Sequence, residues 1–213
     1  KVIEEREEQI RPCVGATFCL DGIYENGEAL CVHNAATGRE AIMPHKVFPA
    51  EKHRRIVVIG AGPAGLEAAR VAGERGHDVT VFEAMPKAGG QIALTVRNKR
   101  RQDFQGVVDW RLAELERLGV KILYDQIAEV QDITVLEPDV VVIATGGLPQ
   151  IPALEYGTEL AVTSWDVLSG EVTPQGNVLL YDDNGTHSAL STAEASGYSW
   201  LINTTHETES PRL

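Results

Sequence analysis

The sequence predicts an α/β fold in which a doubly wound parallel sheet follows an irregular, cysteine-containing segment. Two short runs that are entirely apolar, at residues 56–59 and 140–143, are typical of parallel strands buried on both faces. Helical patterns alternate with further strand patterns around them, which favours a Rossmann-like order of elements. All three cysteines precede residue 32, and no long periodic stretch occurs within residues 13–50.

The first elements follow from local patterns. Residues 1–12 are predicted to be the last turns of a helix that Pro12 ends. The run from Ile56 to Gly60 predicts a strand. It leads into the helical pattern LEAARVAGER, which has small residues on one side and a stop at Gly76. A second strand is expected from Val79 to Ala84.

The next helix has the clearest amphipathic pattern, because apolar residues recur at intervals of three and four from Phe104 to Leu118, before Gly119. Short strands are expected at 120–124 and near 128–130. The run 139–147 predicts another fully buried strand that ends in a glycine turn. After a proline-containing linker, residues 177–196 predict a second strand-turn-helix unit, followed by a polar tail.

Charge and composition exclude several classes of function. The formal net charge of −12 repels nucleic acid and anionic membrane surfaces. No stretch approaches eighteen consecutive apolar residues, and the charged N-terminal residues lack the apolar core of a signal peptide. An odd number of cysteines in one segment argues against a secreted disulfide framework, so we expect a reduced, cytoplasmic setting.

The strongest motif is Gly60-Ala61-Gly62-Pro63-Ala64-Gly65, which follows a predicted strand and opens a predicted helix. In such a motif the first glycine makes the turn, the second lets the backbone approach a pyrophosphate, and the third permits close packing of helix and strand. Glu83, at the end of the next strand, is suitably spaced to accept hydrogen bonds from ribose hydroxyls. The motif therefore predicts a dinucleotide site; the alternative is a glycine turn that only packs.

Further residues resemble those of FAD-binding flavoprotein reductases. After the GAGPAG motif and Glu83 come Gly89-Gly90-Gln91 and then Ala144-Thr145-Gly146-Gly147 with Pro149, which matches a second fingerprint, T-G-x-x-P, of those enzymes. The resemblance covers residues 55–150 and implies binding of FAD or ADP. The cofactor-binding residues it implies are Gly60, Gly62, Pro63, Ala64, Gly65, Glu83, Ala84, Gly90, Gln91, Ala144, Thr145 and Gly146.

The cysteine segment resembles the iron–sulfur segment of the trimethylamine dehydrogenase and 2,4-dienoyl-CoA reductase family, which includes demethylases of N-methylated amino acids. That family reads C-x2-C-x2-or-x3-C-x11-or-x12-C, followed by N-P-x-x-G-x-E. Cys13, Cys19 and Cys31 match the first, third and fourth ligand positions, and residues 34–40 match the tail except that Ala35 replaces its proline. Ala16 stands at the second ligand position and has no donor atom.

The three cysteines leave several alternatives open. As metal ligands they could hold a [3Fe–4S] cluster, or a [4Fe–4S] cluster in which water, His33 or Asp21 completes the set. Structural zinc is a smaller alternative, because the usual close C-x2-C pair is absent. A site that has decayed to free or buried thiols is the remaining reading. From Ala16 we expect no cluster or an incomplete one.

The resemblance also implies the organisation of the whole enzyme: an FMN-bearing (β/α)8 barrel, the iron–sulfur segment, and a pair of Rossmann-like modules. Accordingly, residues 1–50 are predicted to be the end of the barrel region with the iron–sulfur segment, residues 51–155 the FAD-binding domain, and residues 156–213 a linker with the start of a second, truncated NAD(P)H-type module. The expected partners are the nucleotide cofactor and the FMN barrel, and a homo-oligomer is left open.

The predicted function is therefore that of the cofactor-binding part of a flavin- and iron–sulfur-dependent oxidoreductase. It would pass electrons between a nicotinamide or external acceptor and the FMN barrel, and the chain alone is expected to be inactive. No catalytic residue is assigned in it. The alternative is a non-catalytic module that holds ADP or FAD as a structural element.

Overall fold

The computed structural model describes residues 1–149, 155–182 and 187–197. In this part of the chain one parallel sheet forms from β1 (Arg55–Ile59), β2 (Asp78–Phe82), β3 (Lys121–Leu123) and β4 (Val140–Ile143), in the order β3-β2-β1-β4. β1 pairs with both β2 and β4, and β2 pairs with β3. The predicted α/β class with a parallel sheet is confirmed.

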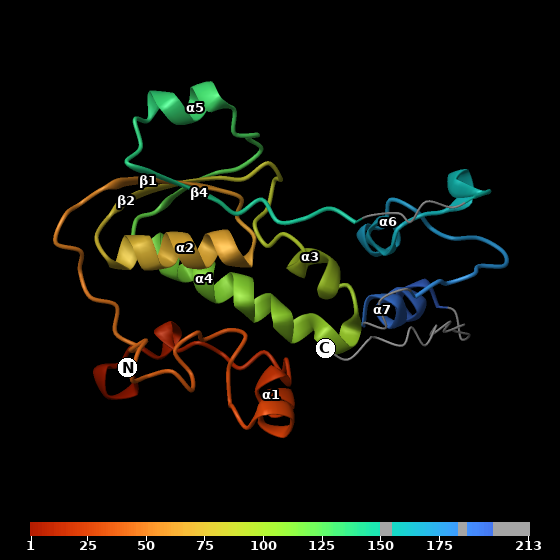
Figure 1. Cartoon of the computed structure of the whole chain (residues 1–213), viewed down its shortest axis with the longest axis horizontal. Coiled ribbons are helices and arrows are strands. Elements are labelled where there is room, and N and C mark those ends of the chain that lie inside the picture. Colours follow the sequence, from red (N-terminus) through yellow and green to blue (C-terminus); the bar gives the residue numbers. More distant parts are fainter. Residues whose placement is uncertain (150–154, 183–186, 198–213) are drawn as a thin grey trace, which may run out of the picture. The chain divides into compact units, whose positions relative to one another are not determined.

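Two helices pack against each other on one face of this sheet. α2 (Pro63–Glu74) connects β1 to β2, and α4 (Gln105–Arg117) precedes β3. In Figure 1 both lie below the sheet, whereas the short helix α5 (Val130–Val135) lies above it. The predicted amphipathic helix is α4, and it ends two residues before Gly119.

The hydrophobic core lies between the sheet and these two helices. Alternate strand residues face α2 and α4, as expected for strands whose side chains point to opposite faces in turn. Leu66 and Ala69 of α2 and Leu115 of α4 are among the most buried side chains. The core cluster consists of Ile56, Val58, Ala61, Leu66, Ala69, Ala72, Val79, Val81, Val108 and Leu115.

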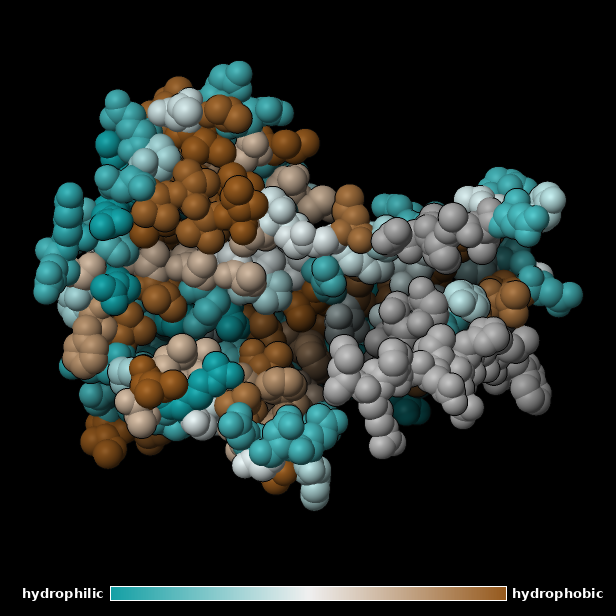
Figure 2. All heavy atoms as spheres, in the orientation of Figure 1, coloured by the Kyte–Doolittle hydropathy of each residue, from teal (hydrophilic) through white to brown (hydrophobic). Residues whose placement is uncertain are grey.

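The prediction that the run 139–147 is buried on both faces is wrong for the residues that point away from α2 and α4. Val140 and Val142 pack on the core, but Val141 is 40% exposed and Ile143 is 76% exposed. Figure 2 shows apolar side chains gathered between the sheet and α5. The strand lies at the edge of the sheet, where α5 spans only six residues and cannot cover both outward side chains.

The strand predicted near 128–130 is also wrong, because α5 begins there. Glu129 precedes the helix, and its backbone N–H donates to the Asp132 carboxylate at 3.1 Å. The Glu129 carboxylate in turn accepts from the Asp132 N–H, which completes a capping box. Two reciprocal caps therefore favour a helical turn where the apolar residues alone suggested a strand.

The N-terminal segment contains short elements: η1 (Val2–Glu4), η2 (Glu7–Gln9) and α1 (Phe18–Asn26). The predicted end of an α-helix over residues 1–12 is wrong, since both turns are 3-10 turns separated by Glu5 with φ of +55°. Four glutamates between residues 4 and 8 repel one another at helical spacing. Residues 13–50 are otherwise irregular, as expected, apart from α1.

Residues 94–102 and the described residues from Gly147 onward form a second unit. Its elements include η4 (Thr158–Leu160), α6 (Ser164–Ser169) and α7 (His187–Ser196), and α6 packs on α7. The predicted helix of the second strand-turn-helix unit is α7, but residues 177–182 form no strand. Residues 183–186 and the tail from 198 lie outside the described residues. The predicted domain boundaries stay a prediction.

Two connecting elements complete the described chain: α3 (Ile92–Thr95) and η3 (Lys99–Phe104). The basic run at 97–101 lies partly in η3, and Arg100 faces Glu194 of α7 at 3.7 Å. Within the described ranges, no helix has the length and apolar character that crossing a bilayer requires.

Candidate functional site: a nucleotide site at the carboxyl edge of the sheet

The glycine motif lies where β1 ends and α2 begins. Gly60 has φ of +100°, and a Cβ at this residue would lie 2.4 Å from the Ala144 carbonyl oxygen. A Cβ at Gly65 would lie 1.9 Å from the Gly60 carbonyl oxygen. Because real Cβ atoms do not approach other atoms so closely, the fold itself requires glycine at both positions.

Gly62 differs from these two glycines. Its φ of −72° and ψ of 177° suit any residue, and a Cβ there would come no closer than 4.0 Å to the nearest atom, Gly90 Cα. Gly62 is the N-cap residue of α2, and no side chain caps this helix end. Pro63 is the first residue of the helix. An open cradle before a helix N-terminus without a side-chain cap fits a pyrophosphate, which binds N–H groups and the positive end of the helix dipole.

Glu83 follows β2 directly and is only 8% exposed. One carboxylate oxygen accepts from the Ala61 N–H at 2.7 Å and the other accepts from the Met85 N–H at 2.8 Å. These bonds hold the side chain beside the glycine motif. Each carboxylate oxygen can accept more than one hydrogen bond, so ribose hydroxyls can still bind to it.

Two further loops meet this motif. The Gly89 N–H donates to the Ala61 carbonyl oxygen at 2.9 Å, which brings the loop before α3 against the glycine motif. On the other side, the Ala144 N–H donates to the Ile59 carbonyl oxygen at 2.8 Å and continues the pairing of β4 with β1. The structure therefore brings all of the sequence-predicted nucleotide-binding residues to one edge of the sheet.

The strand order of the sheet also indicates a ligand site at this edge. From β1 the chain proceeds to β2 and then to β3 on one side, and β4 lies on the other side of β1. The strand order thus reverses between β1 and β4, and the loops 60–65 and 144–146 stand at that point. In open parallel sheets, ligands bind at such a switch point, outside the carboxyl ends of the strands.

The cysteine segment carries the three candidate ligands of an iron–sulfur cluster. Cys13 and Cys19 are exposed, Cys31 is half-buried, and all three are free thiols. Among the residues that the structure describes, no three histidine, cysteine, aspartate or glutamate side chains gather as a metal site would require. In the described residues the three thiols are therefore not gathered around a common metal position.

The sequence analysis missed a buried cluster centred on Glu67, one turn into α2. Its carboxylate contacts the guanidinium groups of Arg70 at 2.8 Å, Arg111 at 2.9 Å and Arg11 at 3.1 Å. Burial raises the pKa of Glu67, but the hydrogen bond and charge of Arg70, with the charges of Arg111 and Arg11, outweigh it and lower the pKa to about 2.

The same cluster includes Trp110 and His33. The guanidinium of Arg11 lies 4.3 Å from the centre of the Trp110 ring, and the His33 ring meets Trp110 edge-on at 5.6 Å. His33 is 2% exposed, and its carbonyl oxygen accepts from Arg11 at 2.6 Å and from Arg111 at 3.3 Å. We call these residues (Arg11, His33, Glu67, Arg70, Trp110 and Arg111) the Glu67 cluster.

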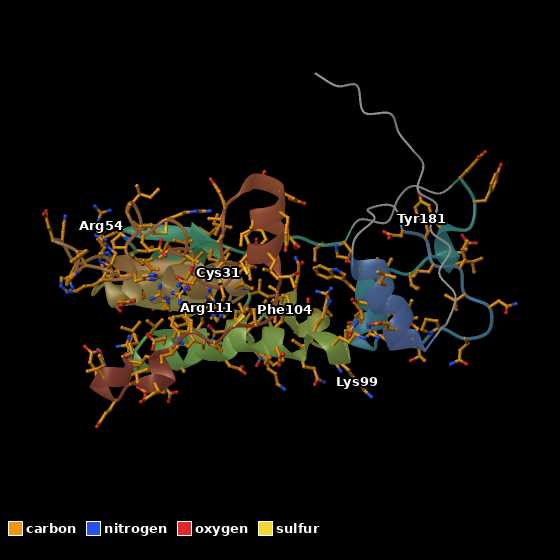
Figure 3. The ribbon with its side chains drawn as sticks, turned by 90° about the horizontal axis from the view of Figure 1, so that it is seen from below. Cys31, Arg54, Lys99, Phe104, Arg111 and Tyr181 are labelled. Atoms are coloured by element: carbon orange, nitrogen blue, oxygen red, sulfur yellow. The ribbon has the colours of Figure 1, made fainter. Side chains whose placement is uncertain are left out.

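The Glu67 cluster fastens the cysteine segment to α2 and α4. His33 follows Cys31 by two residues, and its Nδ1 donates to the Pro12 carbonyl oxygen at 3.0 Å. Figure 3 labels Cys31 and Arg111 in this part of the molecule. The spacing of Glu67 and Arg70 on one helix was visible in the sequence, but the contributions of Arg11 and Arg111 depend on the tertiary structure.

Residues 34–40, which match the tail of the iron–sulfur segment, have a local structural role. The Asn34 side chain accepts from the Ala36 N–H at 3.3 Å, and the Glu40 carboxylate accepts from the Gly38 N–H at 3.3 Å. Gly38 has φ of +74°, and a Cβ there would lie 2.8 Å from the Ala29 carbonyl oxygen. These residue types therefore stabilise a turn directly after Cys31.

Comparison with known proteins shows which family this chain is similar to. Residues 54–172 match the family model of pyridine nucleotide-disulphide oxidoreductases. A probable N-methylproline demethylase of Rhizobium meliloti (strain 1021) is 55% identical over 91% of this chain and 29% of its own length. A multifunctional alkene reductase/demethylase OYE of Caballeronia cordobensis is 46% identical over 91% of this chain and 28% of its own length.

Among solved structures, a 2-naphthoyl-CoA reductase in complex with 2-naphthoyl-CoA is similar, with a TM-score of 0.83 and 32% sequence identity. The match covers 92% of this chain and 30% of that one. The chain therefore spans less than a third of the length of these relatives.

Proposed function

The chain belongs to the pyridine nucleotide-disulphide oxidoreductase family, and from this premise we propose that it binds the ADP half of FAD at the carboxyl edge of its sheet. The resemblance to N-methylproline demethylase-like flavin oxidoreductases that the sequence predicted is confirmed. The family match shows an oxidoreductase domain of a flavin-dependent family. We further propose that this domain is the cofactor-binding portion that serves a substrate domain such as the expected FMN barrel.

The open cradle at Gly62 is the observation that carries this proposal. Gly60 and Gly65 are explained by the fold, but neither backbone conformation nor packing explains glycine at position 62. A ligand that approaches the backbone closely does explain it. The helix N-terminus supplies the positive field for a pyrophosphate, and Glu83 supplies acceptors for the ribose.

In this proposal the residues of the chain bind and orient, while the flavin, when bound, supplies the redox chemistry. Pro63 pre-sets the first turn of α2, so that the N–H groups of Ala64 and Gly65 are held in helical positions before the ligand arrives. Glu83 is fixed by two backbone N–H groups and loses little freedom on binding. The loop 144–146 closes the site on the β4 side.

We also propose a reduced, cytoplasmic setting, because the three cysteines are free thiols. The rival function, a non-catalytic module that keeps ADP or FAD as a structural element, uses the same pocket. Purified protein with flavin absorbance bands would favour the oxidoreductase portion, whereas colourless protein with bound ADP would favour the rival.

The proposal is tested by a Gly62→Ala substitution. The added methyl group occupies the cradle, so ADP affinity should fall about tenfold or more, the scale of one lost charge-assisted hydrogen bond. The melting temperature should change little, because the nearest atom to the added Cβ lies 4.0 Å away. Isothermal titration with ADP and a thermal melt measure both quantities.

Gly60→Ala is the matched variant in the same loop. Its Cβ would clash with the Ala144 carbonyl oxygen, so this variant should lower the melting temperature itself. Wild-type protein that fails to bind ADP and FAD, or a Gly62→Ala variant with unchanged ADP affinity, would contradict the proposed site.

A further inference from the structure

Helix α2 carries both the nucleotide cradle and the Glu67 cluster. The cradle lies just before Pro63, the first residue of the helix, and Glu67 is the fifth. At about 1.5 Å of rise per residue, the two positions are about 6 Å apart along the helix axis. At about 0.1 M salt, charges are screened only beyond about 10 Å. A pyrophosphate in the cradle is therefore within range of the charges around Glu67.

Three arginines compensate the negative charge of Glu67, and they come from different parts of the chain. Arg70 lies one turn further along α2, and Arg111 lies on α4. Arg11 precedes the cysteine segment and contacts Glu67 at 3.1 Å. Among the described residues, this is the ion pair that joins α2 to a residue before β1. The compensation of Glu67 therefore depends in part on where the cysteine segment lies.

The position of Arg11 is fixed by the cysteine segment. Its guanidinium donates to the His33 carbonyl oxygen at 2.6 Å, and the His33 ring donates to the Pro12 carbonyl oxygen at 3.0 Å. His33 is 2% exposed and Ala36 is 6% exposed, so this part of the segment is buried. Loss of the Arg11–Glu67 pair and loosening of the residues around His33 are linked, because one guanidinium makes both contacts. We call the observed arrangement the docked state, and the arrangement without the Arg11–Glu67 pair the released state.

The two states differ in the charge that a pyrophosphate would meet. In the docked state the Glu67 carboxylate is shared by three arginines. In the released state it keeps only Arg70 and Arg111, and Arg70 also pairs with Glu74. A negative ligand near this carboxylate therefore binds the docked state more tightly. A ligand shifts an equilibrium by its difference in affinity for the two states, and the charge of Arg11 supplies that difference.

The open amino end of α2 acts in the same direction. No side chain caps this end, and the first N–H groups of a helix have no partner within the helix. A pyrophosphate supplies acceptors for these groups and so stabilises the first turn. Because Glu67 directly follows that turn, a more ordered turn holds its carboxylate where Arg11 contacts it.

We propose that the Arg11–Glu67 ion pair couples the nucleotide site to the cysteine segment, so that an ADP group in the cradle favours the docked state and the docked state favours ADP binding. This inference rests on the proposed function, since it assumes an ADP group in the cradle. Arg11 is then a positioning residue, which acts through Glu67 and α2. By thermodynamic linkage, the two effects have the same magnitude.

The test measures docking and binding separately on the whole chain. Hydrogen exchange of residues 33–39, followed by mass spectrometry, reports docking, and titration calorimetry reports ADP affinity. Saturating ADP should slow the exchange of these residues about fivefold or more in wild-type protein, the scale of an ordinary coupling between sites. Arg11→Gln should reduce that slowing to about twofold or less and lower ADP affinity about threefold or more.

Two further variants separate charge compensation from a general loss of stability. Arg11→Lys keeps the positive charge, so it should retain most of the slowing and most of the ADP affinity. Arg6→Gln removes an exposed arginine of the same N-terminal region, which pairs with Glu4 and does not contact α2. This matched control should change neither quantity.

The outcomes separate this inference from the proposed function. Wild-type protein that binds neither ADP nor FAD would overturn both. Wild-type protein that binds ADP without slower exchange of residues 33–39 would overturn the coupling alone. Equal slowing in wild type and Arg11→Gln would also overturn it, because ADP would then stabilise the chain without help from the ion pair. An Arg11→Lys variant that behaves like Arg11→Gln would overturn the role of the charge.

Discussion

At the scale of single residues, the space around each glycine distinguishes a structural requirement from a ligand-binding role. A Cβ added at Gly60 or Gly65 would clash with backbone atoms, so the loop conformation itself requires glycine at these two positions. Gly62 has open space and ordinary dihedral angles. Glu83 combines both roles, because it fixes the loop through Ala61 and keeps free acceptor capacity for a ribose.

Glu83 should also determine which nucleotide is accepted. A carboxylate accepts from the 2′-hydroxyl of a ribose and repels a 2′-phosphate, so wild-type protein should bind ADP-ribose more tightly than its 2′-phosphorylated form. Glu83→Ala should weaken ADP-ribose binding by about 1–3 kcal/mol and narrow the difference between the two ligands. Titration calorimetry with both ligands measures this, and an unchanged affinity for ADP-ribose would sink the assignment.

Glu67 makes the stability of the protein depend on pH. Its folded-state pKa of about 2 lies below the usual value of 4.5, so its contribution is complete above pH 4.5 and is lost as the pH falls toward 2. The difference of the two pKa values corresponds to about 3 kcal/mol of stability. Urea unfolding of wild-type protein should show about 2 kcal/mol of this loss between pH 7 and pH 3, and the rest below pH 3.

Glu67→Gln removes the titrating group and should flatten that part of the pH dependence, although it also lowers stability at neutral pH by leaving three arginines without their shared carboxylate. Glu74→Gln on the same helix removes only a contact to Arg70 and serves as the milder control. A Glu67→Gln variant whose stability falls with acid as steeply as wild type would contradict the role of the Glu67 cluster.

At the scale of elements, the sequence predicted what depends on local pattern and missed what depends on distant neighbours. The strands β1, β2 and β4, the helices α2 and α4 and the glycine motif follow from apolar runs and turn residues close together in sequence. An apolar run alone does not reveal whether a second layer covers its outer face, which is why the exposure of Ile143 was missed. Glu67 binds Arg11, which lies 56 residues away in sequence, and no local pattern predicts that contact.

The cysteine segment gives a prediction at this scale. The family pattern places a fourth thiolate at position 16, where this chain has alanine, so Ala16→Cys should raise the iron bound after anaerobic reconstitution toward about four per chain. Iron counting and paramagnetic resonance measure it. Ala41→Cys adds a thiol to the same segment at a position outside the pattern and should not raise bound iron.

The iron bound by the native chain after the same reconstitution is the second measurement. A stable cluster of about four irons in the native chain would mean that another residue supplies the ligand, and our interpretation of Ala16 would be wrong. If Ala16→Cys binds no more iron than Ala41→Cys, the segment does not form a cluster site and the prediction is wrong.

At the scale of the whole molecule, the proposed site is one half of a flavin site. In this proposal the cradle and the ribose acceptor both belong to the ADP half, and both lie on the first unit of the chain. The chain spans less than a third of its relatives, so a binding surface for the isoalloxazine ring is expected from the remainder of such proteins. Binding energy for the flavin ring should then be missing here.

This leads to a comparison of two ligands that share the ADP half. If the ring finds no partner on this chain, FAD and ADP should bind with affinities within about threefold of each other, since a group that makes no contacts adds little binding energy. Parallel titrations of the purified chain measure the ratio. FAD binding that is about thirtyfold tighter or more, about 2 kcal/mol, would show that the chain also holds the ring. Turnover of an amine or an enoyl-CoA by this chain alone would contradict the proposal that the chain is the cofactor-binding portion of such an enzyme.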